Sequence, residues 1–302
     1  MELRHLRYFV AVAEEGSLSN AADKRLHTAQ PSLSRQIRDL ELEVGAKLFE
    51  RQARGITLTP AGKVFLNHAR LALLQVETAA EAARRAAQPD KPGFVVGFIA
   101  GQEVTWLPKT LRILREEAPG TEISFLSLTS PELAHSLMRG RADVGFLRRE
   151  AQSTGLVYKP LIDEPLVVVL PISHRLSNAK SIDPRELTRE IYIGPAKVAP
   201  TLRCVIDDYA KKEGISLQPA YESENLNAAI SLVTSTGGMT LAPICAKNML
   251  TPSVIARPLR GDAPTIPLML GYNKSNTSAL LKRFMLRSDE LQAGMQKQIS
   301  LK

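Results

Sequence analysis

Cysteine is nearly absent from this sequence of 302 residues. The two cysteines, Cys204 and Cys245, lie far apart, and neither belongs to a C-x-x-C pair or to a histidine cluster with metal-ligand spacing. This excludes a disulfide framework and indicates no metal site, so we predict no metal ligands. We interpret both residues as structural thiols. A thiol-based redox switch that uses Cys204 and Cys245 stays open as the alternative.

Long hydrophobic runs are absent as well. No apolar stretch approaches the roughly 20 residues that a membrane-spanning helix needs. The short apolar run at the start of the chain is interrupted by Arg4, Arg7, Glu14 and Glu15, so it does not read as a secretory signal. We therefore expect a cytoplasmic protein with no membrane partner.

The sequence also lacks the short motifs of common enzymes. It contains no G-x-G-x-x-G, P-loop, G-x-S-x-G or H-E-x-x-H pattern, and its five histidines have no carboxylate or cysteine partners at a recognisable spacing. We predict no catalytic residue, no cofactor and no enzymatic activity.

The composition that remains is that of a globular protein, with 44% hydrophobic and 23% charged residues and enough length for two or three domains. The net charge is +8, but residues 1–63 hold ten Lys or Arg and eight Asp or Glu, a net of only +2. The net charge is therefore weak support for DNA binding, which depends on where the individual charges lie.

An apolar stripe with spacings of four, three and four predicts a helix within Thr28–Val44. Thr28 is its predicted N-cap, and Pro31 lies in the first turn, where a missing N–H costs little. The residues of the stripe are Leu33, Ile37, Leu40 and Val44.

The opposite face of this helix carries side chains that can bind DNA. Glutamine can read adenine, arginine can read guanine, and hydroxyls can bind phosphate oxygens. These groups lie in the first half of the helix and the acids in the second, which suits a helix that enters a groove by its N-terminal end. An ordinary amphipathic helix stays open as the alternative. The polar residues of this face are Gln30, Ser32, Ser34, Arg35 and Arg38.

Two shorter helices before this segment indicate a helix-turn-helix. A stripe over residues 3–13 predicts a first helix that ends at Gly16, and Ser17 or Ser19 caps a short second one. Gly45 is the expected C-terminal glycine of the third helix.

A small hairpin over residues 47–59 follows and has the position of a wing. Arg51 and Arg54 lie at its tip. We interpret both as phosphate contacts, with solvated loop charges as the alternative.

Thr59 as N-cap and Pro60 at the first helical position predict a long helix that ends near Ala87. Small and apolar residues recur along it at alternating spacings of three and four, which is typical of a coiled-coil seam. We predict that this helix forms a homodimer; packing on the same chain stays open. The predicted dimer residues are Leu66, Ala69, Leu73, Val76, Ala80 and Ala83.

About the first 90 residues resemble LysR-type transcriptional regulators. The resemblance is carried by LRYFVAVAEEGSLSNAA, by LHTAQPSLSRQIRDLELEVGAKLFERQARGITLTPAG and by the linker helix that follows. It implies a winged helix-turn-helix that binds double-stranded DNA as a homodimer or tetramer, with RNA polymerase as a further candidate partner. The DNA-binding residues on this reading are Thr28, Gln30, Pro31, Ser32, Ser34, Arg35, Arg38, Arg51 and Arg54.

The rest of the chain alternates between apolar strands and helices, which predicts an α/β sheet buried on both faces. The segments GRADVGF, DEPLVVVLP and GGMTLAP extend the resemblance to the effector domain of LysR-type regulators, which resembles two-lobed periplasmic binding proteins with a ligand between the lobes. Predicted strands are Gly93–Ile99, Glu122–Leu128, Ala142–Leu147, Leu166–Leu170, Ile191–Ile193, Met239–Ala242 and Pro267–Tyr272. Predicted helices are Leu107–Glu117, Pro131–Arg139, Leu202–Glu213, Leu226–Thr234 and Ala279–Leu291.

The expected fold is therefore α/β overall, in three parts. Residues 1–59 form the winged helix-turn-helix, residues 60–88 the linker dimerisation helix, and residues 93–302 the effector-binding domain. Within the last part, we expect lobe I over residues 93–162 and 263–302, and lobe II over residues 163–262.

Ligands of such sheets bind beyond the carboxyl ends of strands, often against helix N-termini. Thr129 and Ser130 follow a predicted strand and start a helix, so they can hold a carboxylate, cap the helix, or do both. Arg148 follows another strand and is a candidate counter-charge, with an ordinary surface arginine as the alternative. The resemblance adds residues from turns of the second lobe: Pro195, Thr201, Leu202 and Asn225.

Gly101, in the turn after the first strand of this domain, completes the predicted effector site. Relatives commonly have a hydroxyl residue there, so the departure removes a donor. The chain as a whole most resembles regulators of aromatic or phenylpropanoid acid degradation, which implies a small aromatic carboxylate as effector. A transport-type binding protein is a further alternative, which the N-terminal helices argue against.

Overall fold

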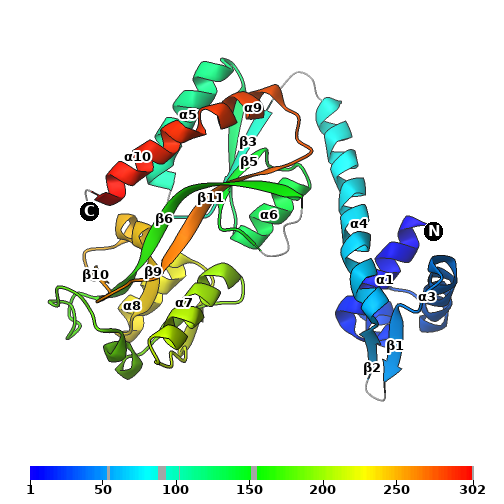
Figure 1. The fold of residues 1–302 in the computed structure, drawn as a ribbon, viewed down its shortest axis with the longest axis horizontal. Coiled ribbons are helices and arrows are strands. Elements are labelled where there is room, and N and C mark those ends of the chain that lie inside the picture. Colours follow the sequence, from blue (N-terminus) through cyan, green and yellow to red (C-terminus); the bar gives the residue numbers. More distant parts are fainter. Residues whose placement is uncertain (53–54, 88–92, 102, 151–154, 301–302) are drawn as a thin grey trace. The chain divides into compact units, whose positions relative to one another are not determined.

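The structure is a computed structural model that describes residues 1–52, 55–87, 93–101, 103–150 and 155–300 (Figure 1). It consists of two compact units, Met1–Ala86 and Ala87–Lys302. Within the described residues, no helix is long and apolar enough to cross a lipid bilayer.

The first unit is a small helical core with a hairpin and one long helix. Its elements are α1 (Leu3–Glu15), α2 (Leu18–Asn20), the π-helical turn η1 (Ala21–Leu26), α3 (Gln30–Val44), β1 (Phe49–Gln52), β2 (Gly55–Leu58) and α4 (Pro60–Ala86). The ring of Phe9 is fully buried, and it lies 5.0 Å from that of Phe49 and 4.9 Å from that of Phe65. This aromatic cluster joins α1, the hairpin and α4.

Three of the predicted helix ends are confirmed. Gly16 and Gly45 have φ values of 60° and 75°, in the left-handed region that glycine adopts without strain. The Ser17 hydroxyl accepts a hydrogen bond from the N–H of Asn20, so Ser17 caps the second helix.

Two expectations for α3 are wrong. Its N-cap is Ala29 and not Thr28, because the helix begins two residues after Thr28. Val44 is 37% exposed, whereas Glu41 is only 8% exposed and takes the inward position instead. Its carboxylate accepts hydrogen bonds from the N–H groups of Leu48 (2.8 Å) and Phe49 (3.1 Å) at the start of the hairpin. A polar anchor therefore occupies the place that the spacing assigned to an apolar side chain.

The start of α4 is fixed by a cap and by one close approach. The Thr59 hydroxyl accepts from the N–H of Gly62 (2.9 Å) and donates to the carbonyl of Lys47 (2.7 Å), which confirms Thr59 as the N-cap. A Cβ at Gly62 would lie 2.0 Å from the Leu48 carbonyl oxygen, so only glycine fits.

The predicted dimer seam of α4 is partly wrong. Ala69 is buried in the core of its own unit, and Leu66 and Leu73 pack against the same core. Val76, Ala80 and Ala83 are exposed. The first half of the stripe, from Leu66 to Leu73, thus packs within its own unit. The second half, from Val76 to Ala83, offers its apolar surface to another chain.

The second unit is built on a seven-stranded sheet of order β10-β6-β11-β5-β3-β4, with β9 also paired to β6. β3, β4 and β5 run parallel, and the pairs of β6 and β11 are antiparallel. The strands are β3 (Gly93–Phe98), β4 (Glu122–Ser127), β5 (Val144–Leu147), β6 (Leu156–Pro171), β9 (Thr240–Pro243), β10 (Val254–Pro258) and β11 (Thr265–Asn273).

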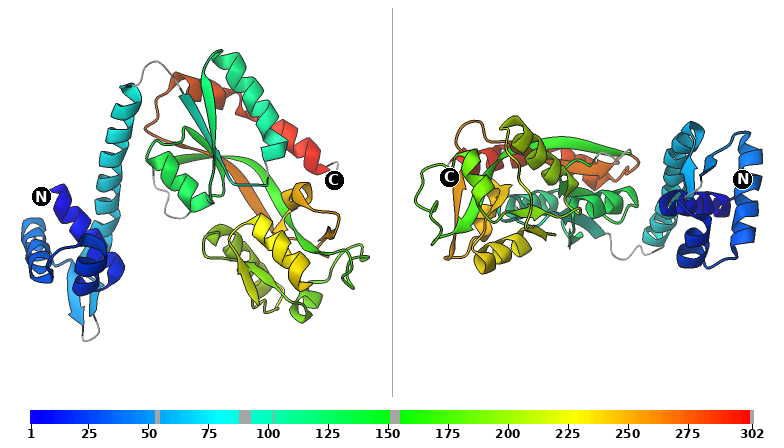
Figure 2. Two further views of the ribbon diagram at one scale, coloured as in Figure 1. Left: turned by 180° about the vertical axis from the view of Figure 1, so that it is seen from behind. Right: turned by 90° about the horizontal axis from the view of Figure 1, so that it is seen from below.

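The helices of the first lobe cover its sheet on both faces. Phe94 and Val96 face a core shared with α5 (Glu103–Glu117), α9 (Ala279–Leu286) and α10 (Ser288–Ser300), and Val95 faces α6 (Ser130–Met138) on the other side. Figure 2 shows these helices from two further directions. The edge strand β4 departs from the prediction of full burial, since Phe125 and its neighbours are largely exposed.

The second lobe surrounds the far end of β6. It contains β9, β10, a separate parallel pair β7 (Ile193–Pro195) and β8 (Tyr221–Ser223), the helices α7 (Pro200–Lys212) and α8 (Leu226–Thr236), and two 3-10 helices, η2 (Pro184–Arg189) and η3 (Ile244–Met249). β8, β10 and both 3-10 helices were absent from the sequence prediction.

The largest difference from the predicted strands concerns β6. The sequence predicted Leu166–Leu170, but β6 begins ten residues earlier and passes through both lobes beside β11. Pro160 and Pro165 explain the omission, because proline within a run argues against a strand interior. The ladder shifts register between Leu268 and Met269, opposite Pro160, and it keeps Pro165 paired with Thr265.

We predict opposite effects for the same change at two glycines. Gly62→Ala should lower the free energy of unfolding of the first unit by at least about 2 kcal/mol despite the better helix propensity of alanine, because the added carbon overlaps the Leu48 carbonyl. Gly294→Ala in α10 should raise the stability of the second unit by up to about 1 kcal/mol, because its Cβ would meet only Lys109 at 3.6 Å.

Urea unfolding of the full chain measures both. Far-ultraviolet circular dichroism follows both units, and Trp106, the single tryptophan, reports on the second unit by fluorescence. A neutral effect of Gly62→Ala would contradict the close packing of α4 on β1.

Candidate functional site

The polar face of α3 is displayed as the sequence predicts. Leu33, Ile37 and Leu40 are buried. On the other side, Gln30, Pro31, Ser32, Arg35 and Arg38 are exposed, and Thr28 and Ser34 are half-buried. Arg54 and the side chain of Arg51 lie outside the described residues, so their contact with phosphates stays a prediction.

The side chains of this face are only weakly held by the protein. The Arg35 guanidinium lies 3.9 Å from the Asp39 carboxylate, and Arg38 donates to the carbonyl of Ser34 at 3.4 Å. Exposed pairs of this kind contribute little to stability. Ala29 offers no side-chain cap, so the first N–H groups of α3 are left for another partner, such as a phosphate.

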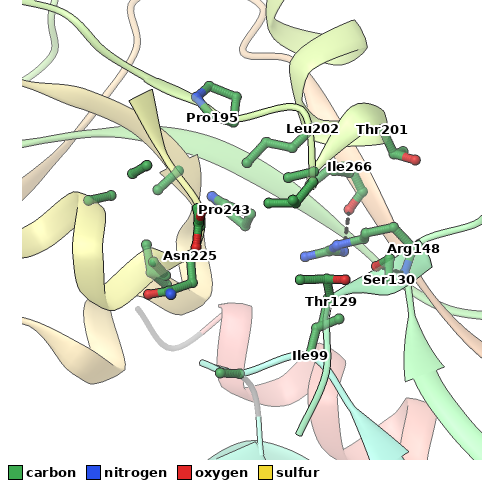
Figure 3. Close-up of a pocket in the computed structure, with 18 of the residues that line it drawn as sticks. Ile99, Thr129, Ser130, Arg148, Pro195, Thr201, Leu202, Asn225, Pro243 and Ile266 are labelled. Carbon is green, nitrogen blue, oxygen red and sulfur yellow. Dashed lines mark hydrogen bonds between the residues drawn. The ribbon is translucent and has the colours of Figure 1, made fainter. Parts of the chain in front are cut away.

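A second candidate site is a cavity of about 450 Å³ between the two lobes (Figure 3). Strand ends and helix starts of both lobes converge on it. Seven of the eight predicted effector residues line it: Thr129, Ser130, Arg148, Pro195, Thr201, Leu202 and Asn225.

Gly101 does not line this cavity, so that prediction is wrong. Its φ of 106° lies in a region that side chains rarely adopt, and a Cβ there would lie 2.9 Å from Met249 Sδ and 3.1 Å from Leu226 Cδ2 of lobe II. Its N–H donates to the Glu103 carboxylate at 2.7 Å. The turn therefore closes against the other lobe, and the absence of a hydroxyl side chain follows from the contact.

Arg148 does not offer an uncompensated charge, which corrects its role as a counter-ion. Its side chain is 7% exposed and that of Glu164 only 4%. The two are joined at 2.5 Å, and the guanidinium also donates to the Ile266 carbonyl at 3.1 Å (Figure 3). The pair bridges β5 to β6 and β11 beneath the cavity. A ligand anion there would have to share Arg148 with Glu164.

Thr129 and Ser130 are also committed to the protein. The Thr129 hydroxyl donates to the Glu132 carboxylate at 2.8 Å, and the Thr129 N–H does so at 3.0 Å, which forms a capping box at the start of α6. The Ser130 hydroxyl accepts from the N–H of Arg148 at 3.0 Å. These bonds support the capping role. They occupy the Thr129 hydroxyl as a donor, whereas the Ser130 hydroxyl is used as an acceptor.

The lobe II wall provides the helix start that lacks a side-chain cap. α7 begins after Ala199, which cannot accept a hydrogen bond, and Thr201 and Leu202 form its first turn. α8 is capped by Asn225, which accepts from the N–H of Ala228 at 2.9 Å. The first turn of α7 is thus the better place for a ligand carboxylate.

Glu132 and Glu150 are lining residues that sequence reasoning missed. Glu150 is half-buried and accepts from the Thr201 hydroxyl at 3.2 Å. Burial raises the pKa of Glu150, and the hydrogen bond from Thr201 opposes that rise only in part. Glu150 lies just two positions beyond Arg148 at the end of β5, so the strand-end rule that identified Arg148 could have found it.

The thiols give no support to a redox switch. Both are free. Cys204 is exposed, and its pKa is raised chiefly by the negative charge of Asp208, to which its thiol donates at 3.6 Å. A raised pKa reduces the reactive thiolate. Cys245 is buried against the cavity. Among the described residues, no group of three or more His, Cys, Asp or Glu is placed to hold a metal ion.

Comparison with known proteins decides the family. Residues 3–63 match the family described as bacterial regulatory helix-turn-helix protein, lysR family, and residues 88–290 match the LysR substrate binding domain. The chain belongs to the LysR family of transcriptional regulators. It is a DNA-binding regulator with an effector-binding domain, and because members of this family are not enzymes, the prediction of no enzymatic activity is confirmed.

Two curated LysR-family relatives cover nearly the whole chain. The Hca operon transcriptional activator HcaR of Escherichia coli strain K12 is 38% identical over 94% of this chain and 96% of its own length. The regulator AlsR of Bacillus subtilis strain 168 is 35% identical over 94% of each. Full-length CbnR in complex with its target DNA has a similar structure, with a TM-score of 0.56 and 28% identity over 97% of this chain and all of CbnR.

We predict that Arg35 and Gln30 read bases. Arg35→Ala and Gln30→Ala should each weaken operator binding by about 1–3 kcal/mol and relax sequence preference at one base position. Mobility shifts with the DNA beside the gene of this regulator, and with single-base variants of it, measure both effects. Arg189→Ala, an equal loss of charge on exposed surface of lobe II, should leave affinity and preference unchanged. Unaltered binding by both α3 variants would show that another surface docks on the DNA.

Proposed function

We propose that this LysR-family regulator binds its operator as a dimer through α3 and the wing, and that a small aromatic carboxylate in the inter-lobe cavity controls it. In this proposal residues 1–59 bind DNA, residues 60–88 form the dimer and residues 93–302 bind the effector. The protein would act in the cytoplasm. The observation that carries the proposal is the cavity itself, which has room for an aromatic acid and ends at the uncapped first turn of α7.

The choice of an aromatic acid is supported by the family context. The chain resembles regulators of aromatic acid degradation along its length, and one relative is an activator of the Hca operon. Most of the surface that faces the cavity is apolar, from side chains such as Ile99, Leu128, Leu202 and Leu226. Apolar walls with one anion-binding turn suit a ring that carries a carboxylate.

The effector can switch the regulator only if it binds one arrangement of the protein more tightly than another. The lobes share the strands β6 and β11, so a ligand held by both lobes favours one angle between them. In the proposed dimer, that change would alter how the two copies of α3 are spaced on the operator.

Blocking the cavity tests the effector site. Val198→Trp places a large side chain at an exposed lining position, and we expect at least a tenfold loss of affinity for 3-phenylpropanoic acid, about 1.4 kcal/mol, with operator binding in the absence of ligand retained. Isothermal calorimetry and mobility shifts measure the two quantities. Val104→Trp, at an exposed position of α5 that does not line the cavity, is the matched control. Equal affinity in both variants would place the ligand elsewhere.

The exposed half of the α4 stripe supports the dimer. Val76 is 39% exposed, and Ala80 and Ala83 continue the same face one and two turns further on. Val76→Glu would bring two carboxylates together across the seam and should dissociate the dimer and weaken operator binding. Sedimentation velocity measures the mass.

Val64→Glu is the control for this change. Val64 is an exposed valine of α4 that lies about 120° around the helix from Val76, so the same charge there should leave the dimer intact. A Val76→Glu protein that keeps the wild-type mass would move the interface away from α4.

A further inference from the structure

The lobe I wall of the cavity carries acceptors where a carboxylate receptor would carry donors. Among the described lining residues, the charged side chains are Glu132, Glu150, Glu224 and Arg148. The guanidinium of Arg148 is already joined to the buried Glu164 carboxylate. Glu224 belongs to lobe II, so the carboxyl groups that a ligand meets on the lobe I side are those of Glu132 and Glu150.

Glu132 occupies the position that a bound anion would take at the start of α6. Its carboxylate accepts from both the N–H and the hydroxyl of Thr129, at 3.0 and 2.8 Å. The same two donors hold the pKa of Glu132 below its usual value, so the group is ionised at neutral pH. Glu103 plays the same part at the start of α5, where it accepts from the N–H of Gly101 at 2.7 Å. The starts of α5 and α6 thus already hold a carboxylate of the chain.

The two walls consequently differ in what they accept. The lobe II wall has the first turn of α7, whose N–H groups have no side-chain cap and suit a ligand carboxylate. The Glu150 carboxyl of lobe I accepts a hydrogen bond from the Thr201 hydroxyl of this turn. The lobe I wall has an ionised carboxylate whose remaining lone pairs can accept a hydrogen bond. A hydroxyl at the far end of the ligand is attracted to that group, whereas a second carboxylate is repelled by it.

We infer that Glu132 is a specificity-determining residue that selects aromatic monocarboxylic acids with a hydroxyl opposite the carboxylate and rejects dicarboxylic acids. This inference rests on the proposed function, because it takes the cavity to be the effector site. The contact is a hydrogen bond from the ligand hydroxyl to the Glu132 carboxylate, in addition to the capping bonds that Glu132 keeps with Thr129.

Glu132→Gln removes the charge and preserves the cap. Glutamine at this position of a capping box can accept from the Thr129 N–H as glutamate does, so α6 should remain folded. The melting temperature of the variant should stay within about 3 °C of the wild type, which corresponds to less than about 1 kcal/mol for a domain of this size. Glu122→Gln, an exposed glutamate at the start of β4, is the control for the change in net charge.

Three probes that share the phenylpropanoic acid skeleton and differ only in the para substituent separate the possibilities by calorimetry on the full chain: 3-phenylpropanoic acid, 3-(4-hydroxyphenyl)propanoic acid and 3-(4-carboxyphenyl)propanoic acid. The wild type and Glu122→Gln should bind the hydroxylated acid at least about tenfold more tightly than the diacid. In Glu132→Gln this ratio should fall to about threefold or less, chiefly because the diacid gains affinity.

The outcomes distinguish the inference from the proposal on which it rests. If the wild type binds the diacid as tightly as the hydroxylated acid, or if Glu132→Gln keeps the wild-type ratio, the role of Glu132 is wrong, while the cavity remains an aromatic carboxylate site. If none of the three acids binds the wild type, both are wrong. Only a high wild-type ratio that collapses in Glu132→Gln and persists in Glu122→Gln supports the inference.

Discussion

The pairing of β6 with β11 is the constraint on which the second unit depends. These two strands belong to both lobes: the near part of β6 pairs with β11 beside β5, and its far part pairs with β9 and β10. The side chains of β6 accordingly enter the hydrophobic cores of both lobes, with Leu161 in one and Val168 in the other. Because the lobes share a ladder instead of a flexible linker, any change of the angle between them has to be absorbed by twist and by the register shift at Leu268 and Met269.

The chemistry of the cavity depends on which helix N-termini have a side chain of the protein that accepts their hydrogen bonds. Every helix begins with N–H groups that need acceptors, and side chains of the same chain compete with ligands for them. The N-cap of α6 is Thr129, with Glu132 bonded back to it, and that of α8 is Asn225, whereas α7 has only Ala199 at this position. The helix starts around the cavity thus differ through the side chains at their caps. Which ligands the cavity selects should depend on these capping residues as much as on the other side chains that line it.

The sequence predicted local features well and partnerships poorly. The three helices of the helix-turn-helix, the caps at Ser17 and Thr59, and the lining residues Thr129, Ser130 and Arg148 follow from periodicity, capping residues and strand ends. The four lining residues of lobe II were implied only by the family resemblance. The buried Arg148–Glu164 pair joins residues of different strands, and no spacing rule relates them. The same holds for Glu41, which reads as an exposed acid until the hairpin folds onto it. The sequence predictions thus failed mainly for polar side chains whose hydrogen-bond partners are brought close only by the tertiary structure.

The turn at Gly101 restricts which residues this position can accept. A serine at this position would require the turn to leave its φ of 106° and Met249 of the opposite lobe to withdraw its sulfur. The Met249 sulfur belongs to a flexible side chain and can move, whereas the positive φ strains any other residue whatever the space. The backbone of this turn is therefore the stronger of the two constraints that keep a hydroxyl residue from position 101.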